Sequence, residues 1–141
     1  MINEFCQGID QFNQEDFYGC HDTLEALWME AMEPQKRFYQ GILQIAVGCY
    51  HLGNLNCRGA AILLGEGIRQ IKDYQPVYES IDVSGLITQS LNLLKMVQQL
   101  ESEKITDFVQ VLKTAPIDYM NETCNEKIGR FPKIMRVDAG C

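Results

Sequence analysis

The fold of this chain is decided by residues 21–51, which read HDTLEALWMEAMEPQKRFYQGILQIAVGCYH. On both sides of Pro34, apolar residues recur at intervals of three and four, the spacing of one face of an α-helix. Proline fits the first position of a helix, because its missing N–H has no partner there in any case. We therefore predict helices over about 14–32 and 34–52. The connection between them is so short that they must form an antiparallel hairpin.

Helical spacing extends outward from this hairpin in both directions. A short helix with Phe5 and Phe12 on one side is expected to end near Asn13, which we also expect to cap the following helix. Further helices are predicted over about 55–73 and from residue 83, the latter capped by Asp82. A last short helix is predicted over about 105–112.

These helices predict an all-α fold, a compact bundle of about five to six helices. A chain of 141 residues is the size of one ordinary domain, so we expect a single helical domain over 1–141. Its core bundle would cover about 2–101, with the C-terminal segment 102–141 packing on it or partly mobile. Leu93, Met96 and Leu100 form a second apolar edge, which predicts packing against that segment or against another copy in a homo-oligomer.

Composition and the N-terminal sequence limit which partners and which compartment we expect. The formal net charge of -7 disfavours nucleic acid, since duplex binding depends on Lys and Arg neutralising phosphates. No apolar run is long enough to cross a bilayer, so we expect no membrane association. The N-terminus lacks the basic start and apolar stretch of a secretory signal, which predicts a cytoplasmic protein. The six cysteines show no zinc-like spacing, and in a reducing compartment most should be free thiols. We expect no metal and no cofactor.

Polar residues occupy helix faces that we expect to be buried. In the helix predicted over 14–32, His21, Glu25 and Trp28 fall on one narrow stripe. The spacing of four places the His21 imidazole one turn from the Glu25 carboxylate, where the two can hydrogen-bond or converge on a third group. Trp28, one turn further on, would shield that pair from water.

The next helix and the one after it supply the remaining candidates. Gln40 and Gln44 align on one polar strip of an otherwise apolar helix, and an unpaired buried amide costs about 1–3 kcal/mol. We therefore expect both to face His21 and Glu25. His51 extends the strip about two turns beyond Gln44 and is the weaker member. Arg58 lies near a helix start, where a cation is unfavourable, so Glu25 or an anionic ligand is its expected partner.

These residues also carry a family resemblance. The runs FNQEDFYGCHDTLEALW over 12–28, FYQGILQIA over 38–46 and HLGNLNCRGA over 51–60 closely resemble the domain of unknown function 309. The resemblance covers about residues 12–71 and implies a small all-helical bundle, with no established activity or ligand. It marks where a site would lie, at His21, Glu25, Trp28, Gln40, Gln44, Asn54 and Arg58.

Three interpretations of the polar cluster remain open. In the favoured one, the protein is a structural or interaction module with a buried His/Glu/Gln network that fixes helix register, and its partner is unknown. The alternative is a small-ligand or metal pocket built on His21 and Glu25, although one helical His/Glu pair falls short of a di-iron ligand set. A hydrolytic enzyme would use the same two side chains as acid and base, but the sequence identifies no catalytic residue beyond them.

Overall fold

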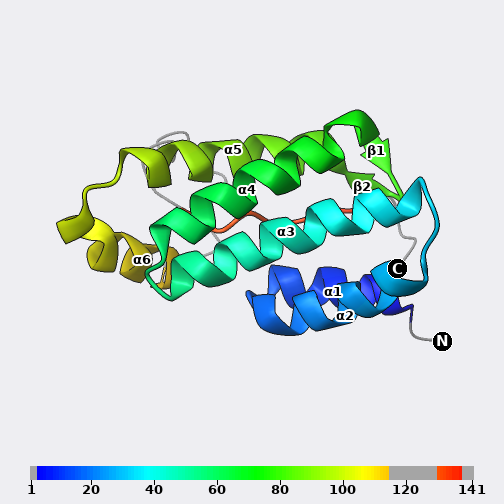
Figure 1. Cartoon of the computed structure of the whole chain (residues 1–141), viewed down its shortest axis with the longest axis horizontal. Coiled ribbons are helices and arrows are strands. Elements are labelled where there is room, and N and C mark those ends of the chain that lie inside the picture. Colours follow the sequence, from blue (N-terminus) through cyan, green and yellow to red (C-terminus); the bar gives the residue numbers. More distant parts are fainter. Residues whose placement is uncertain (1–2, 115–129, 138–141) are drawn as a thin grey trace.

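The computed structural model describes residues 3–114 and 130–137, and in these residues the chain is a bundle of α-helices (Figure 1). The all-α prediction is confirmed. The helices are α1 (Glu4–Asn13), α2 (Phe17–Glu30), α3 (Gln35–Gly53), α4 (Cys57–Ile71), α5 (Val83–Gln99) and α6 (Ile105–Thr114). Short 3-10 turns, Lys72–Tyr74 and Ser102–Lys104, follow α4 and precede α6. The strands β1 (Val77–Tyr78) and β2 (Ile81–Asp82) pair antiparallel between α4 and α5.

The first five helices pack largely in the order of the sequence. α1 contacts α2, α2 contacts α3, α3 contacts α4 and α4 contacts α5, so α3 lies at the centre of the bundle (Figure 1). The predicted antiparallel hairpin is formed by α2 and α3. Helix α3 carries nine of the buried residues, among them Phe38, Ile42 and Ile45, which are fully enclosed. No helix in the described part of the chain is long and apolar enough to cross a membrane.

The starts of α2, α4 and α5 share one capping arrangement. In each, an Asp or Asn oxygen accepts the backbone N–H of a glycine three residues later, at 2.9–3.0 Å. A Cβ on that glycine would collide with the capping side chain, so the glycine leaves room for the cap. The pairs are Asp16 with Gly19, Asn56 with Gly59 and Asp82 with Gly85.

These caps confirm one predicted helix start and correct another. Asp82 caps α5 as predicted, but the prediction that Asn13 caps the second helix is wrong. Helix α1 continues through Asn13, and Glu15 then turns the chain with a φ of 66°, so that Asp16 becomes the cap. The Asn13 side chain instead binds the C-terminal segment, accepting from the Ile134 N–H at 2.7 Å and donating to the Ile134 carbonyl at 2.9 Å.

Residues 130–137 pack across the bundle as an extended segment. Phe131 and Ile134 are buried, and Arg136 forms a β-bridge with Ile81. The short helix predicted over 105–112 is confirmed as α6. That the segment 102–141 packs on the core or is partly mobile stays a prediction. Residues 115–129 and 138–141 of that segment lie outside the described part of the chain. The assignment of 1–141 to one domain stays a prediction.

Candidate functional site

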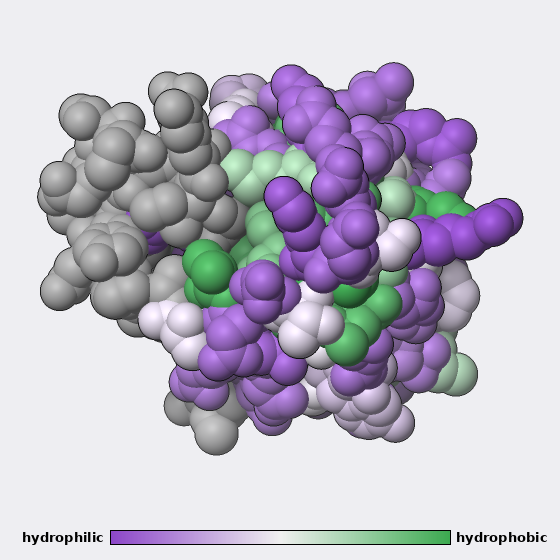
Figure 2. All heavy atoms as spheres, turned by 90° about the vertical axis from the view of Figure 1, so that its left-hand side faces the viewer, coloured by the Kyte–Doolittle hydropathy of each residue, from purple (hydrophilic) through white to green (hydrophobic). Residues whose placement is uncertain are grey.

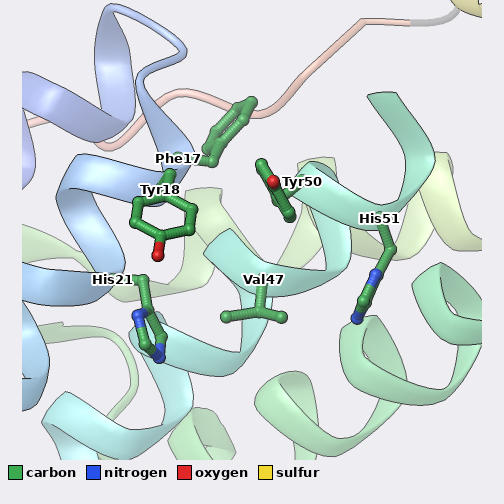
Figure 3. Close-up of a pocket in the computed structure, with 6 residues that line it drawn as sticks. All are labelled: Phe17, Tyr18, His21, Val47, Tyr50 and His51. Atoms are coloured by element: carbon green, nitrogen blue, oxygen red, sulfur yellow. The ribbon is translucent and has the colours of Figure 1, made fainter. Parts of the chain in front are cut away.

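An open hollow of about 150 Å³ lies between α2 and α3 (Figure 3). We call it the α2–α3 pocket. Three of its lining residues come from each helix: Phe17, Tyr18 and His21 from α2, and Val47, Tyr50 and His51 from α3. Both histidines of the chain therefore line one pocket.

Helical spacing brings the lining residues together. In α2 the aromatic rings precede His21 by four and three positions, and in α3 Val47 precedes Tyr50 and His51 by three and four, so each set lies on one face. Phe17 is only 5% exposed, whereas Tyr18 and Tyr50 are 59% and 39% exposed. Figure 3 shows His21 and His51 on opposite sides of Val47. The buried Phe17 thus closes the pocket, and its rim is aromatic.

The two rim tyrosines contact each other edge to face. Their ring centroids are 5.6 Å apart at an interplanar angle of 64°. Tyr18 also lies near His21, at 6.4 Å between ring centroids, and Tyr50 near His51, at 6.3 Å. This arrangement favours an apolar or aromatic group as the occupant, because ring faces and edges offer large contact areas and few hydrogen-bonding groups.

His21 lines the pocket and also contacts two carboxylates of α2. Its Nδ1 lies 3.3 Å from Asp22 Oδ1 and its Nε2 lies 3.8 Å from Glu25 Oε2. The expected approach of His21 and Glu25 is therefore present. Their expected burial is wrong, because the His21 side chain is 30% exposed and the Glu25 side chain is 51% exposed.

The reason lies in which stripe of α2 faces the core. Phe17, Cys20 and Leu24 are the buried residues of this helix. The stripe that holds His21 and Glu25 lies beside this apolar stripe, roughly 80° around the helix axis. Since the apolar stripe already fills the space against α1 and α3, the polar stripe stays at the surface.

Trp28 does not shield His21 and Glu25 from water, contrary to expectation. The residue is half-buried near the other end of α2 and is not part of the pocket wall. Lys36 lies with its Nζ 4.2 Å from the indole centroid and donates to the Trp28 carbonyl at 2.7 Å. The buried indole Nε1 has no hydrogen-bond partner among the described residues.

The glutamines and the arginine of the predicted site do not join His21. Gln40 and Gln44 are half-buried on α3, and among the described residues neither hydrogen-bonds His21 or Glu25. Gln44 Oε1 is buried there without a partner. Arg58 is exposed and forms no ion pair with Glu25, because α4 lies across α3 from α2 (Figure 1). The assignment of these residues to a site stays a prediction.

The structure adds residues that the sequence reasoning missed or undervalued. His51 lines the pocket with His21, and its Nδ1 lies 3.5 Å from Asn56 Nδ2. Tyr18, Val47 and Tyr50 were not identified as candidates. The sequence could have indicated Val47, because it lies between Gln44 and His51 on the same strip of α3. Whether Val47 lines a pocket, however, depends on which residues of α2 lie opposite it.

Cys20 and Cys49 are poorly suited to act as nucleophiles at this site. Burial, with a smaller effect of Asp16, raises the pKa of the Cys20 thiol from 9.0 to about 12, and burial also raises the pKa of Cys49. Both therefore stay protonated near neutral pH. Cys20, Cys49 and Cys57 are free, as expected, whereas Cys6 is disulfide-bonded. The predicted cytoplasmic location stays a prediction.

A second hollow, of about 330 Å³, lies at the end of the bundle where α3 meets α6. It shares Phe17 and Tyr50 with the α2–α3 pocket. Figure 2 looks onto this end, where apolar residues are visible among hydrophilic ones. Its two charged lining residues already have partners: Glu15 pairs with Lys133, and Lys113 donates to a backbone carbonyl. In the part of the chain that the structure describes, no three His, Cys, Asp or Glu residues are grouped to hold a metal ion.

Comparison with known proteins agrees with the family resemblance. Residues 5–63, from α1 to the first turns of α4, match the model of the family described as "Domain of unknown function (DUF309)". The chain is also similar to the uncharacterized protein YpuF of Bacillus subtilis (strain 168), with 27% identity over 112 residues. That alignment covers 77% of this chain but 62% of YpuF, so the chain spans less than two thirds of this relative. No solved structure matches the chain.

Proposed function

We propose that this chain, with the helical family segment at residues 5–63, is a non-catalytic interaction module. Its recognition site is the α2–α3 pocket, which receives one apolar side chain of a protein partner. One observation carries the proposal: an open, largely aromatic hollow lies on the surface between two helices. Exposed tyrosines are typical of protein interfaces, where an aromatic side chain combines a large apolar area with one polar group.

The size of the pocket supports a side chain rather than a cofactor. Pockets for drug-sized ligands and cofactors usually measure about 300–1,000 Å³. An apolar cavity of about 150 Å³ holds a single benzene-sized ring. The α2–α3 pocket, also about 150 Å³, therefore fits one ring or one aliphatic side chain.

The geometry gives less support to an acid–base role for His21 and Glu25. A general acid near neutral pH usually needs a carboxyl group kept away from water. The Glu25 side chain is 51% exposed and lies 3.8 Å from the imidazole, a loose contact in an open setting. The same exposure argues against a buried polar network as the main role of these residues.

A small-molecule probe tests the pocket directly. We expect p-cresol, the side-chain analogue of tyrosine, to bind with a Kd on the order of 1 mM, as its few heavy atoms allow. In ¹H–¹⁵N spectra, saturable shifts should centre on the amides of His21, Tyr50 and His51. Val47→Trp should abolish them by filling the pocket.

The matched control is Ile62→Trp, which adds the same side chain at an exposed position of α4. This variant should bind p-cresol like the parent. Val47→Phe provides a milder filling in case the tryptophan variant unfolds, as judged by circular dichroism. Shifts that persist unchanged in both Val47 variants, or that never saturate in the parent, would count against the pocket as the recognition site.

A further inference from the structure

The negative charge of this chain is concentrated at one end of the sequence. Residues 1–35 contain eight carboxylates and neither Lys nor Arg, whereas the whole chain has a net charge of -7. These residues supply α1 and α2. One hairpin of the bundle therefore carries the acidity of the protein, and the remainder is close to neutral.

Cations of the C-terminal segment neutralise part of this charge. Asp10 pairs with Arg136 at 2.9 Å, and Glu15 pairs with Lys133 at 3.3 Å. Asp16 caps α2. These three carboxylates therefore already have roles within the fold.

The other carboxylates of α2 and its following turn lack such partners. Asp22 and Glu25 contact His21, and a Glu33 oxygen accepts the backbone N–H of Arg37. Within the described residues, no Lys or Arg side chain forms an ion pair with these three groups or with Glu30. Lys36, the nearest cation in the sequence, is held by the carbonyl and ring of Trp28. Four carboxylates thus remain open to a partner.

Exposed apolar side chains lie along α2 and just beyond its end. Tyr18, Met29 and Met32 are 59%, 69% and 80% exposed. Met32 follows two residues after α2 ends at Glu30. Within the helix, Tyr18, Asp22, Glu25 and Met29 recur at intervals of four and three, so these four residues form one continuous stripe. We call this the outer stripe of α2. Flexible methionines at the surface adapt to varied apolar partners.

We propose that the partner is a basic amphipathic helix that lies along the outer stripe and inserts one apolar side chain into the α2–α3 pocket. This inference rests on the proposed function and adds the chemistry of the partner. Helices dock through apolar residues spaced by three and four, the spacing that the outer stripe presents. Lys or Arg on the flanks of such a helix would pair with Asp22, Glu25, Glu30 and Glu33.

Charge also disfavours two other occupants. A second copy would bring the same carboxylates, none paired with Lys or Arg among the described residues, against this face, and like charges repel at an interface. An anionic membrane surface attracts basic segments and would repel an acidic one. A basic helix relieves the repulsion among the carboxylates of α2, and steering by opposite charge would speed its association.

The test uses three synthetic peptides of about 14 residues, long enough for a helix of about 21 Å, the length of α2. One is an amphipathic helix of Leu and Lys, one has Glu in place of Lys, and one has Ser in place of Leu. Binding to the full chain is followed by fluorescence anisotropy. We expect the Leu/Lys peptide to bind, and the Leu/Glu and Ser/Lys peptides to bind at least about tenfold more weakly.

Two charge-matched triple variants locate the binding face. Asp22→Asn with Glu25→Gln and Glu30→Gln removes three charges from α2. Glu101→Gln with Glu103→Gln and Asp107→Asn removes three exposed charges near α6. Surface ion pairs contribute modestly, so we expect roughly a tenfold loss of Leu/Lys affinity in the first variant. The second should change by less than about twofold, since charges beyond a Debye length of about 10 Å are screened.

The pocket variant separates this inference from the proposed function. If Val47→Trp weakens peptide binding but the α2 triple variant does not, the pocket is used and the basic partner is wrong. If the α2 triple variant weakens binding but Val47→Trp does not, the acidic surface is used and the pocket proposal is wrong. Equal losses in both triple variants, equal binding of the Ser/Lys peptide, or no binding of the Leu/Lys peptide would each overturn the inference.

Discussion

The central helix α3 packs against α4 and against α2 in two different ways. Toward α4, small residues let the backbones meet: a Cβ on Gly67 would lie 2.6 Å from the Gly41 carbonyl oxygen. Toward α2, aromatic and imidazole side chains separate the helices, and the α2–α3 pocket remains between them. The size of the contacting side chains thus decides whether an interface of α3 is closed or leaves a pocket.

The largest expected effect is the difference in stability between substitutions on the buried side and on the exposed side of α2. Phe17→Ala should destabilise the protein by about 3–5 kcal/mol, because it removes a buried ring from the base of the pocket. Tyr18→Ala, at the exposed rim, should cost less than about 1 kcal/mol. Urea unfolding followed by circular dichroism measures both. Similar losses in the two variants would show that the rim and base of the pocket are not distinct.

The closed interface is tested by enlarging one glycine. Gly67→Val should destabilise the fold by about 1–3 kcal/mol, because the new side chain must push α4 away from α3. Gly65→Ala is the matched control in the same helix, where an added Cβ meets no atom within 4 Å. It should stabilise the protein by up to about 1 kcal/mol through helix propensity. A neutral Gly67→Val would contradict the close approach of the two backbones.

The smallest effect concerns alkaline pH and the buried thiol of Cys20 in α2. The pKa of Cys20 is raised from 9.0 to about 12, so between these values the unfolded chain loses a proton that the folded chain keeps. Its stabilising contribution is therefore complete below pH 9 and falls as the pH rises. From about pH 8 to about pH 10, the parent should lose about 1.4 kcal/mol more of its free energy of unfolding than Cys20→Ala. Equal losses would mean that Cys20 ionises freely in the folded protein.

Helix positions were largely predictable because they depend on neighbouring residues. The Pro34 boundary and the Asp82 cap act over only a few positions, and both mark helix starts in the structure. The mistaken cap at Asn13 could also have been avoided from neighbouring residues. Asp16 is followed three residues later by Gly19, the pairing that also begins α4 and α5, and this local signal was present in the sequence.

The candidate site was less predictable because it depends on two helices at once. The polar strip of α3 was recognised through Gln44 and His51, and the stripe of α2 through His21. Which residues of the two helices lie together was not predicted. The expected network joined Gln44 to His21, whereas the structure places His51 in the same pocket as His21. A helical projection gives directions around one axis and no information on the side chains across the interface.

The sequence by itself determined the helices, the short α2–α3 connection and the acidity of the first hairpin, because periodicity, caps and charge are properties of the chain. Only the tertiary structure decided which of two adjacent stripes of α2 is buried. Both contain apolar residues, and the stripe of Phe17, Cys20 and Leu24 faces inward because α1 and α3 enclose it. That choice leaves His21 and Glu25 at the surface and creates the pocket beside them.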